Sequence, residues 1–168
     1  NLLDACQLIL DMAKSRKQQA NCKTTEFDLR KLLAETVRLC EKTIEKKVAV
    51  TWSCDDRILQ FVKSDPVRIR QILINLTSNS LKYTTSGSVQ VNVAWLSFKR
   101  FKVAVTDTGV GIKKEDQDKL FKAFGRILHR EDEILNDKGV GLGLMLSNQL
   151  AFDISPEQER SAISVTSK

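Results

Sequence analysis

Residues 65–83 read DPVRIRQILINLTSNSLKY, and this stretch predicts one long helix with two different faces. An aspartate followed by a proline is a strong helix start, because the carboxylate caps free backbone amides and proline stands where no amide is needed. Residues at helical spacing then predict a buried stripe made of Ile69, Ile72, Leu73, Leu76 and Ser80. The segment from Thr84 to Gly87 is expected to end the helix in a turn.

The polar face of this helix has a composition suited to a phosphate ligand. Asn75, Asn79 and Lys82 are separated by four and three residues, so they share a face roughly opposite the apolar stripe. An amide oxygen can coordinate Mg²⁺, and a lysine supplies positive charge to phosphates. For these residues alone, a polar face that only contacts water is the favoured explanation, because short polar spacings often recur by accident.

The segments on either side predict an α/β fold. Phe27 and Asp28 are expected to open an amphipathic helix whose apolar residues are Leu32, Leu33, Val37, Leu39 and Ile44. Glu115–Phe124 is expected to form a further helix. The expected strands cover residues 48–52, 59–63, 89–96, 101–106 and 162–166. Helices mixed with mainly adjacent strands predict a two-layer α/β sandwich with a mixed sheet.

Two glycine-rich segments follow the helix that begins at Asp65. Asp107-Thr108-Gly109-Val110-Gly111 comes directly after an expected strand, where its carboxylate could accept a hydrogen bond from the amine of a base. A tight turn capped by the aspartate is the alternative. Gly139-Val140-Gly141-Leu142-Gly143-Leu144 leads into a helix, whose exposed amides favour phosphate binding. A Rossmann unit is not indicated, because the preceding segment is polar.

Composition limits the classes of partner. The 168 residues are 42% hydrophobic, enough for one main domain, and no apolar run approaches the roughly 18 residues of a membrane span. The net charge of +6 is spread along the chain without interleaved stacking aromatics, and the four cysteines are irregularly spaced. We therefore expect no nucleic-acid partner, no membrane contact by this segment, and a cytoplasmic location with reduced thiols.

In this order, the motifs resemble the ATP-binding catalytic domain of sensor histidine kinases, part of the superfamily that includes DNA gyrase and the heat-shock ATPase chaperones. The segment from Asn75 to Tyr83 resembles the N box, and Asp107 to Gly111 the first glycine box. Phe121 and Phe124 match the F box, and Gly139 to Leu144 the second glycine box. The resemblance covers roughly residues 27–150 and implies a Bergerat-type fold, in which helices pack on a mixed sheet beneath a lid at Gly125–Lys138.

The resemblance also implies roles for individual residues. Asn79 would hold Mg²⁺, Asn75 and Lys82 would act on the phosphates as the catalytic pair, and Asp107 would bind the adenine amine. The full set implied to bind ATP is Asn75, Asn79, Lys82, Tyr83, Asp107, Gly109, Gly111, Ile112, Gly139, Val140, Gly141, Leu142, Gly143 and Leu144.

The implied function is that of a protein histidine kinase, which uses ATP and Mg²⁺ to transfer the γ-phosphoryl group to a histidine outside this chain in a two-component phosphorelay. Residues 1–22 would be the end of the dimerisation and phosphoacceptor helix with its linker, and residues 23–168 the ATP-binding domain, truncated at its C-terminal end. The expected partners are the upstream phosphoacceptor helix, a response-regulator receiver domain and, in the full-length protein, a second copy in a homodimer. His129 is expected to be a surface residue of the lid.

Two alternatives to phosphoryl transfer are ATP hydrolysis and a non-catalytic binding role. Hydrolysing members of the superfamily carry a glutamate general base where this chain has Asn75, and an amide cannot accept that proton. Little ATP hydrolysis is therefore expected. The other reading is a non-catalytic nucleotide-binding or interaction module derived from a histidine kinase, suggested by the altered sequence after Leu150.

Overall fold

The computed structural model describes residues 23–42, 48–117, 120, 142–155 and 163–167. The chain divides into two compact units, one formed by Lys23–Gly111 and another that contains the residues from Ile112 onward. Each unit is described by itself. Within the described residues, no helix is both long and apolar enough to cross a membrane.

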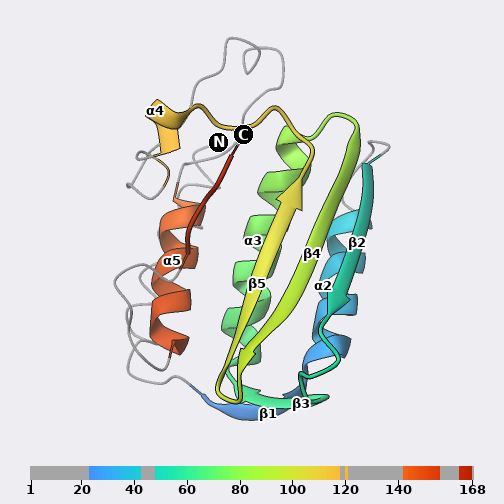
Figure 1. Ribbon diagram of the computed structural model, residues 1–168, viewed down its shortest axis with the longest axis vertical. Helices are drawn as coiled ribbons and strands as arrows, with labels where there is room; N and C mark the ends of the chain where they lie inside the picture. The colour runs from blue at the N-terminus through green and yellow to red at the C-terminus, as the bar shows by residue number, and fades with distance from the viewer. Residues whose placement is uncertain (1–22, 43–47, 118–119, 121–141, 156–162, 168) are drawn as a thin grey trace. The chain divides into compact units, whose positions relative to one another are not determined.

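A three-stranded mixed sheet forms one layer of the Lys23–Gly111 unit (Figure 1). The central strand β4 (Gly87–Ser97) pairs in parallel with β2 (Val48–Cys54) and antiparallel with β5 (Arg100–Asp107). Alternate side chains of β4 point to one face, where Val89, Val91 and Val93 are almost fully buried. The expected mixed sheet is confirmed, and its strands extend one or two residues beyond several of the expected ends. The strand expected at 59–63 instead begins at Phe61 and lies in a separate two-stranded sheet.

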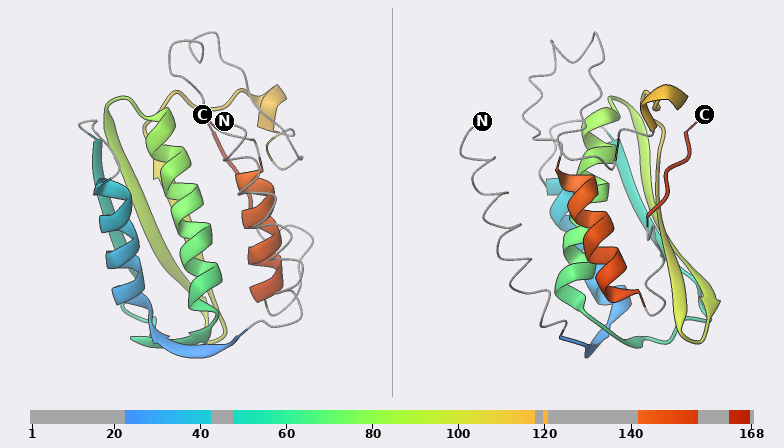
Figure 2. Two further views of the ribbon diagram at one scale, coloured as in Figure 1. Left: turned by 180° about the vertical axis from the view of Figure 1, so that it is seen from behind. Right: turned by 90° about the vertical axis from the view of Figure 1, so that its left-hand side faces the viewer.

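Helices α2 (Leu29–Lys42) and α3 (Pro66–Tyr83) form the second layer on that face (Figure 2). Their core contact with the sheet centres on Cys40, Leu81 and Val89, one residue from each of three elements. The buried positions of α3 are Arg68 in the first turn and a stripe spaced by four, made of Ile69, Leu73, Thr77 and Leu81. The predicted stripe is therefore only partly right, because Ile72, Leu76 and Ser80 lie at its half-buried border.

The start of α3 forms as its sequence predicts. Asp65 is the N-cap, and its carboxylate accepts hydrogen bonds from the amides of Val67 and Arg68, each at 3.1 Å. The same carboxylate pairs with the Arg68 guanidinium at 3.3 Å, with both side chains only 8% exposed. A local cap and a buried ion pair therefore hold the first turn of the helix that carries the asparagine face.

The predicted start of α2 at Phe27 is wrong. Residues Thr25–Asp28 form strand β1, which pairs antiparallel with β3 (Phe61–Ser64). Asp28 nevertheless caps the helix that follows, because its carboxylate accepts a hydrogen bond from the amide of Lys31 at 2.9 Å. Leu39 is exposed rather than in the apolar face, where Cys40 takes its place, and Ile44 lies outside the described residues.

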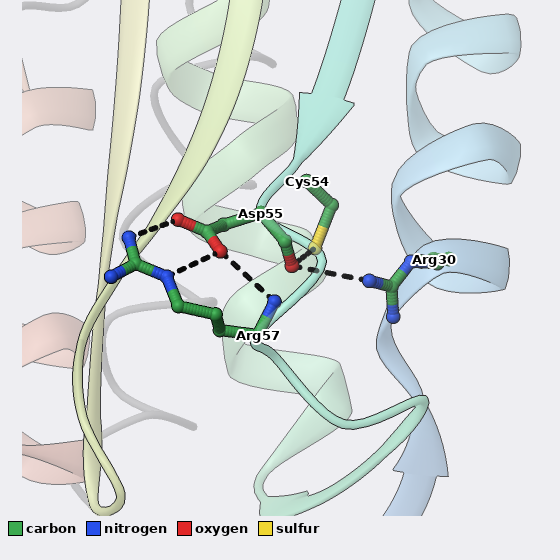
Figure 3. A network of polar contacts seen from close by, with 4 residues as sticks. All are labelled: Arg30, Cys54, Asp55 and Arg57. Atoms are coloured by element: carbon green, nitrogen blue, oxygen red, sulfur yellow. Dashed lines mark hydrogen bonds and ion pairs between the residues drawn. The ribbon is translucent and has the colours of Figure 1, made fainter.

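A polar network joins α2 to the connection between β2 and β3 (Figure 3). The Arg30 guanidinium donates to the carbonyls of Ile58 at 3.0 Å and Asp55 at 3.1 Å. The Asp55 carboxylate binds Arg57 through both oxygens, at 3.0 and 2.7 Å. These hydrogen bonds from Arg57 hold the pKa of Asp55 well below its usual range, whereas burial raises the pKa of the neighbouring Cys54 thiol.

The unit that begins at Ile112 contains α4 (Lys114–Gln117) and α5 (Gly143–Ile154) among its described residues. The helix expected over 115–124 is therefore seen only as its first turn, and most of the remainder lies outside the described residues. The strand expected at 162–166 is wrong for its described part, because residues 163–167 pair with no strand. This segment makes side-chain contacts instead: the Ile163 amide donates to Asn148 Oδ1 at 3.0 Å, and Ser167 Oγ accepts from the Ile112 amide at 2.8 Å.

Candidate nucleotide-binding site

The C-terminal end of α3 meets the loop that follows β5, which brings two of the predicted motifs together. The Val110 amide donates to the Tyr83 carbonyl at 3.3 Å, across 27 residues of sequence. At a helix end the last carbonyls have no partner within the helix, so a loop amide can satisfy one of them. The asparagine-bearing helix and the 107–111 loop are therefore joined by backbone contact.

Gly109 makes this close approach possible. A Cβ at this position would come within 2.4 Å of the Tyr83 carbonyl oxygen and within 3.0 Å of Asp107 Oδ1 and Thr84 Oγ1. The Gly109 amide also donates to Asp107 Oδ1 at 3.0 Å, which orients that carboxylate. Gly111 has a φ of 72°, a left-handed conformation that favours glycine as the loop leaves this point. The two glycines thus have separate structural reasons.

The predicted polar residues of α3 share one half-buried face. Asn75, Asn79 and Lys82 are neither fully exposed nor buried, so their polar groups can reach solvent or a ligand while their stems are fixed. The Lys82 ammonium lies 5.0 Å from the centroid of the Tyr83 ring, within the range of a cation–π contact. Successive positions four residues apart on a helix are separated by about 6 Å, which suits contacts to neighbouring groups of one extended ligand.

Asp107 is the last residue of β5, is exposed, and begins the 107–111 loop. One carboxylate oxygen accepts the Gly109 amide, and within the described residues no donor is recorded for the other. The side chain is exposed, so the second oxygen can accept a hydrogen bond from a ligand. The loop thus offers a fixed acceptor, and α3 offers amides and a cation.

The remaining predicted residues belong to the other unit or lie outside the described residues. The predicted residues outside the described part are Phe121, Phe124, the lid at Gly125–Lys138 with His129, and Gly139, Val140 and Gly141. Leu142 is the buried residue that precedes α5, and Gly143 and Leu144 begin that helix without a side-chain cap. Both backbone groups of Ile112 are engaged: its amide donates to Ser167 Oγ, and its carbonyl accepts from Gln117 Nε2 at 3.1 Å.

Sequence reasoning missed how the loop is attached on its other side. The first residues of β4 bind Thr108, whose amide donates to the Ser88 carbonyl at 3.1 Å. The sequence signal for this attachment is Gly87, which the sequence predicts only as the end of a turn and which has a φ of 110° in the structure. A hydroxyl residue after the aspartate and a glycine 21 positions earlier have no local relation, so only the fold connects them.

Comparison with known proteins identifies the fold and the family. Residues 64–161 match the family model described as histidine kinase-, DNA gyrase B- and HSP90-like ATPase. The signal transduction histidine-protein kinase BarA of Escherichia coli (strain K12) is 31% identical over 166 residues, covering 92% of this chain and 18% of BarA. The chain therefore spans less than a fifth of the length of that relative.

Two solved structures share this architecture. Full-length ShkA in complex with AMPPNP superposes with a TM-score of 0.66 at 25% identity, covering 79% of this chain and 27% of ShkA. The histidine kinase ThkA, in a complex with the response regulator protein TrrA, superposes with a TM-score of 0.59 at 28% identity, covering 74% and 37%. The chain belongs to the histidine kinase-, DNA gyrase B- and HSP90-like ATPase family, and within it to the ATP-binding catalytic domains of histidine kinases.

Proposed function

We propose that this chain binds Mg-ATP and supplies its γ-phosphoryl group to a histidine outside the chain. The observation that carries the proposal is the contact between the end of α3 and the 107–111 loop, which sets an oriented carboxylate beside a helix face of amides and a lysine. In this proposal Asp107 accepts a hydrogen bond from the adenine amine, and Tyr83 lines the pocket. Lys82 and Asn75 contact the phosphates, and the amides of Gly139 to Leu144 contribute at the start of α5.

The donor set fits Mg²⁺ held mainly through the nucleotide. Within the described residues, no group of three or more histidine, cysteine, aspartate or glutamate side chains could hold a metal by itself. Mg²⁺ keeps several waters and commonly takes one or two protein oxygens together with phosphate oxygens. The amide oxygen of Asn79 on the half-buried face of α3 would be such a protein ligand. When bound, the metal neutralises charge on the phosphates.

The residues of the site favour transfer to a protein acceptor over hydrolysis. In the transfer, the bond between the γ-phosphorus and the bridging oxygen breaks, a bond to an imidazole nitrogen forms, and ADP leaves. Asn75 offers no base to activate water, so the chain contributes positioning and charge stabilisation. We place the acceptor histidine on a helix upstream of this chain in a homodimeric parent, and the next acceptor on a receiver domain. ThkA in its complex with a response regulator supports that partner class.

The first test is a calorimetric titration of the whole chain with ATP, with and without Mg²⁺. We expect binding that requires Mg²⁺ and that falls about tenfold or more in Asn79→Ala and in Asp107→Asn, since each removes one contact to a charged or polar ligand group. Gln90→Ala is the matched control, because Gln90 is exposed and alternates along β4 with the buried Val89 and Val91, so its side chain lies on the face of the sheet away from α3. Equal affinities for all four proteins would refute the proposed site.

Transfer is tested separately from binding. The chain, ATP and Mg²⁺ are mixed with a supplied dimerisation and phosphoacceptor domain, and the product is analysed for acid-labile phosphohistidine. We expect phosphorylation that is lost in Asp107→Asn. Binding without transfer to any supplied histidine domain would favour the non-catalytic nucleotide-binding module instead.

A further inference from the structure

Thr108 is tied to the start of β4 and to the residue before it by three hydrogen bonds. Its amide donates to the Ser88 carbonyl at 3.1 Å, and its hydroxyl oxygen accepts from the Ser88 amide at 3.0 Å. The hydroxyl also donates to the Ser86 carbonyl at 3.4 Å. All three groups lie in the Lys23–Gly111 unit, 20 to 22 residues away in sequence.

These bonds complete the β4–β5 ladder in an unusual way. Asp107 is the last residue of β5 and is paired with Val89, so Thr108 and Ser88 are the next opposed residues. In a regular antiparallel pair, two such residues exchange both backbone hydrogen bonds. Here the Thr108 amide makes its bond, but the Ser88 amide is satisfied by the Thr108 hydroxyl in place of the Thr108 carbonyl. The backbone can therefore leave the strand at this residue without an unpaired amide behind it.

Gly87 leaves the space that the Thr108 hydroxyl occupies. Its φ of 110° is a conformation that residues with a side chain rarely adopt, and a Cβ there would lie 2.1 Å from Thr108 Oγ1. The space next to Gly87 is thus filled by the threonine hydroxyl. The turn and the threonine fit one another, and neither could be changed to a larger side chain without moving the loop.

We propose that Thr108 is a positioning residue for nucleotide selection: its hydrogen bonds to Ser86 and Ser88 fix the backbone next to Asp107, so that the Asp107 carboxylate selects the adenine amine. The inference rests on the proposed function and names a residue that has no contact with the nucleotide in that proposal. Asp107 is fixed from one side by the Gly109 amide and, through the backbone, from the other side by Thr108. An exposed carboxylate selects between bases only if its oxygen is held in place.

The test compares two variants of similar shape. Thr108→Val keeps the branched side chain and removes the hydroxyl, and Thr108→Ser keeps the hydroxyl. The whole chain is titrated in Mg²⁺ with ATP and with inosine triphosphate, which carries an oxygen in place of the exocyclic amine. We expect Thr108→Val to lose about tenfold in ATP affinity and less than about threefold in inosine triphosphate affinity, because only ATP uses the positioned carboxylate. Thr108→Ser should restore the selectivity of the wild type.

The ratio of the ATP affinity to the inosine triphosphate affinity separates a positioning role of Thr108 from a merely structural one. A Thr108→Val chain that keeps the wild-type ratio, whether its affinities are unchanged or fall equally, would overturn the inference. Gly87→Ala is the second variant, because it disturbs the same hydroxyl from the other side, and it should lower the ratio in the same direction. If Asp107→Asn abolishes the selectivity and Thr108→Val does not, the proposed function stands and this inference fails. If the wild type shows no preference for ATP, both fail.

Discussion

Gly109→Ala tests whether the close approach of the loop to α3 builds the site. The added Cβ would lie 2.4 Å from the Tyr83 carbonyl oxygen, whereas real Cβ contacts essentially never fall below 3.0 Å. The loop must therefore move by at least 0.6 Å, the difference between 3.0 and 2.4 Å. A shift of that size along the same direction lengthens the contact from the Val110 amide to the Tyr83 carbonyl from 3.3 to 3.9 Å, beyond hydrogen-bonding distance.

The expected cost follows from these two changes. The lost hydrogen bond contributes about 1 kcal/mol, and forcing a methyl group into an occupied space costs about 1–3 kcal/mol, so the unfolding free energy should fall by about 2–4 kcal/mol. Displacement of Asp107 Oδ1, which lies 3.0 Å from the new Cβ, should in addition weaken ATP binding. A misplacement approaching 1 Å can cost up to about 100-fold, and we expect a loss between about tenfold and that limit.

Tryptophan fluorescence during urea unfolding measures the first effect. Both tryptophans, Trp52 and Trp95, lie in the unit that contains the loop, so the signal reports that unit. Val110→Ala is the matched control, because Val110 is the next residue, is exposed and makes its contact to α3 through the backbone. Calorimetry with Mg-ATP measures the second effect. A wild-type urea midpoint and ATP affinity for Gly109→Ala, or equal losses in Val110→Ala, would refute the reasoning.

Three further predictions concern stability. Thr77→Val should raise the unfolding free energy by about 1 kcal/mol, because it removes a buried hydroxyl for which the described residues supply no partner. Thr36→Val is the control and should not raise it, because the Thr36 hydroxyl donates to the Leu32 carbonyl at 2.7 Å. Equal shifts of the urea midpoint in the two variants would contradict this prediction. Asp65→Ala should lower the unfolding free energy by about 3 kcal/mol or more, because α3 loses its N-cap and the buried Arg68 loses this carboxylate. A decrease below about 1 kcal/mol would show that the ion pair contributes little. The pKa of Asp55 in the folded chain is below the ordinary 3.8, so the stability that its charge contributes is present above pH 3.8 and is lost as the pH falls further. Asp55→Asn should therefore have a lower urea midpoint than the wild type at pH 7, and the two midpoints should converge in acid. A difference that does not change with pH would count against this prediction.

The elements that could be predicted are those encoded by neighbouring residues. The start of α3 depends on Asp65 and Pro66, which act within one turn, and the structure confirms it. The alternation along β4 also follows from the period of a strand. Strand β1 could not be predicted, because Thr25–Asp28 are ordered by pairing with Phe61–Ser64, more than 30 residues away, and their own sequence equally suits a helix start.

The predicted strand at 162–166 failed for a related reason. Alternating residues such as Ile163 and Val165 have the propensity for a strand, but a strand needs a neighbour with a free edge. In the described residues 163–167, the Ile163 amide donates to the Asn148 side chain of α5, and the Ser167 side chain accepts from the Ile112 amide. Propensity therefore indicated an extended conformation and said nothing about its partner.

By itself, the sequence determined the kinds of side chain at the candidate site, their spacing along α3 and the order of the motifs, because each depends on residues within one or two helical turns or one loop. Only the tertiary structure decided that Tyr83 meets Val110, that Gly109 must lack a side chain, and that Thr108 completes the ladder beside Ser88. Those contacts join segments 20 or more residues apart. Their formation depends on how α3 packs on the sheet and where β5 ends, which no local pattern of residues specifies.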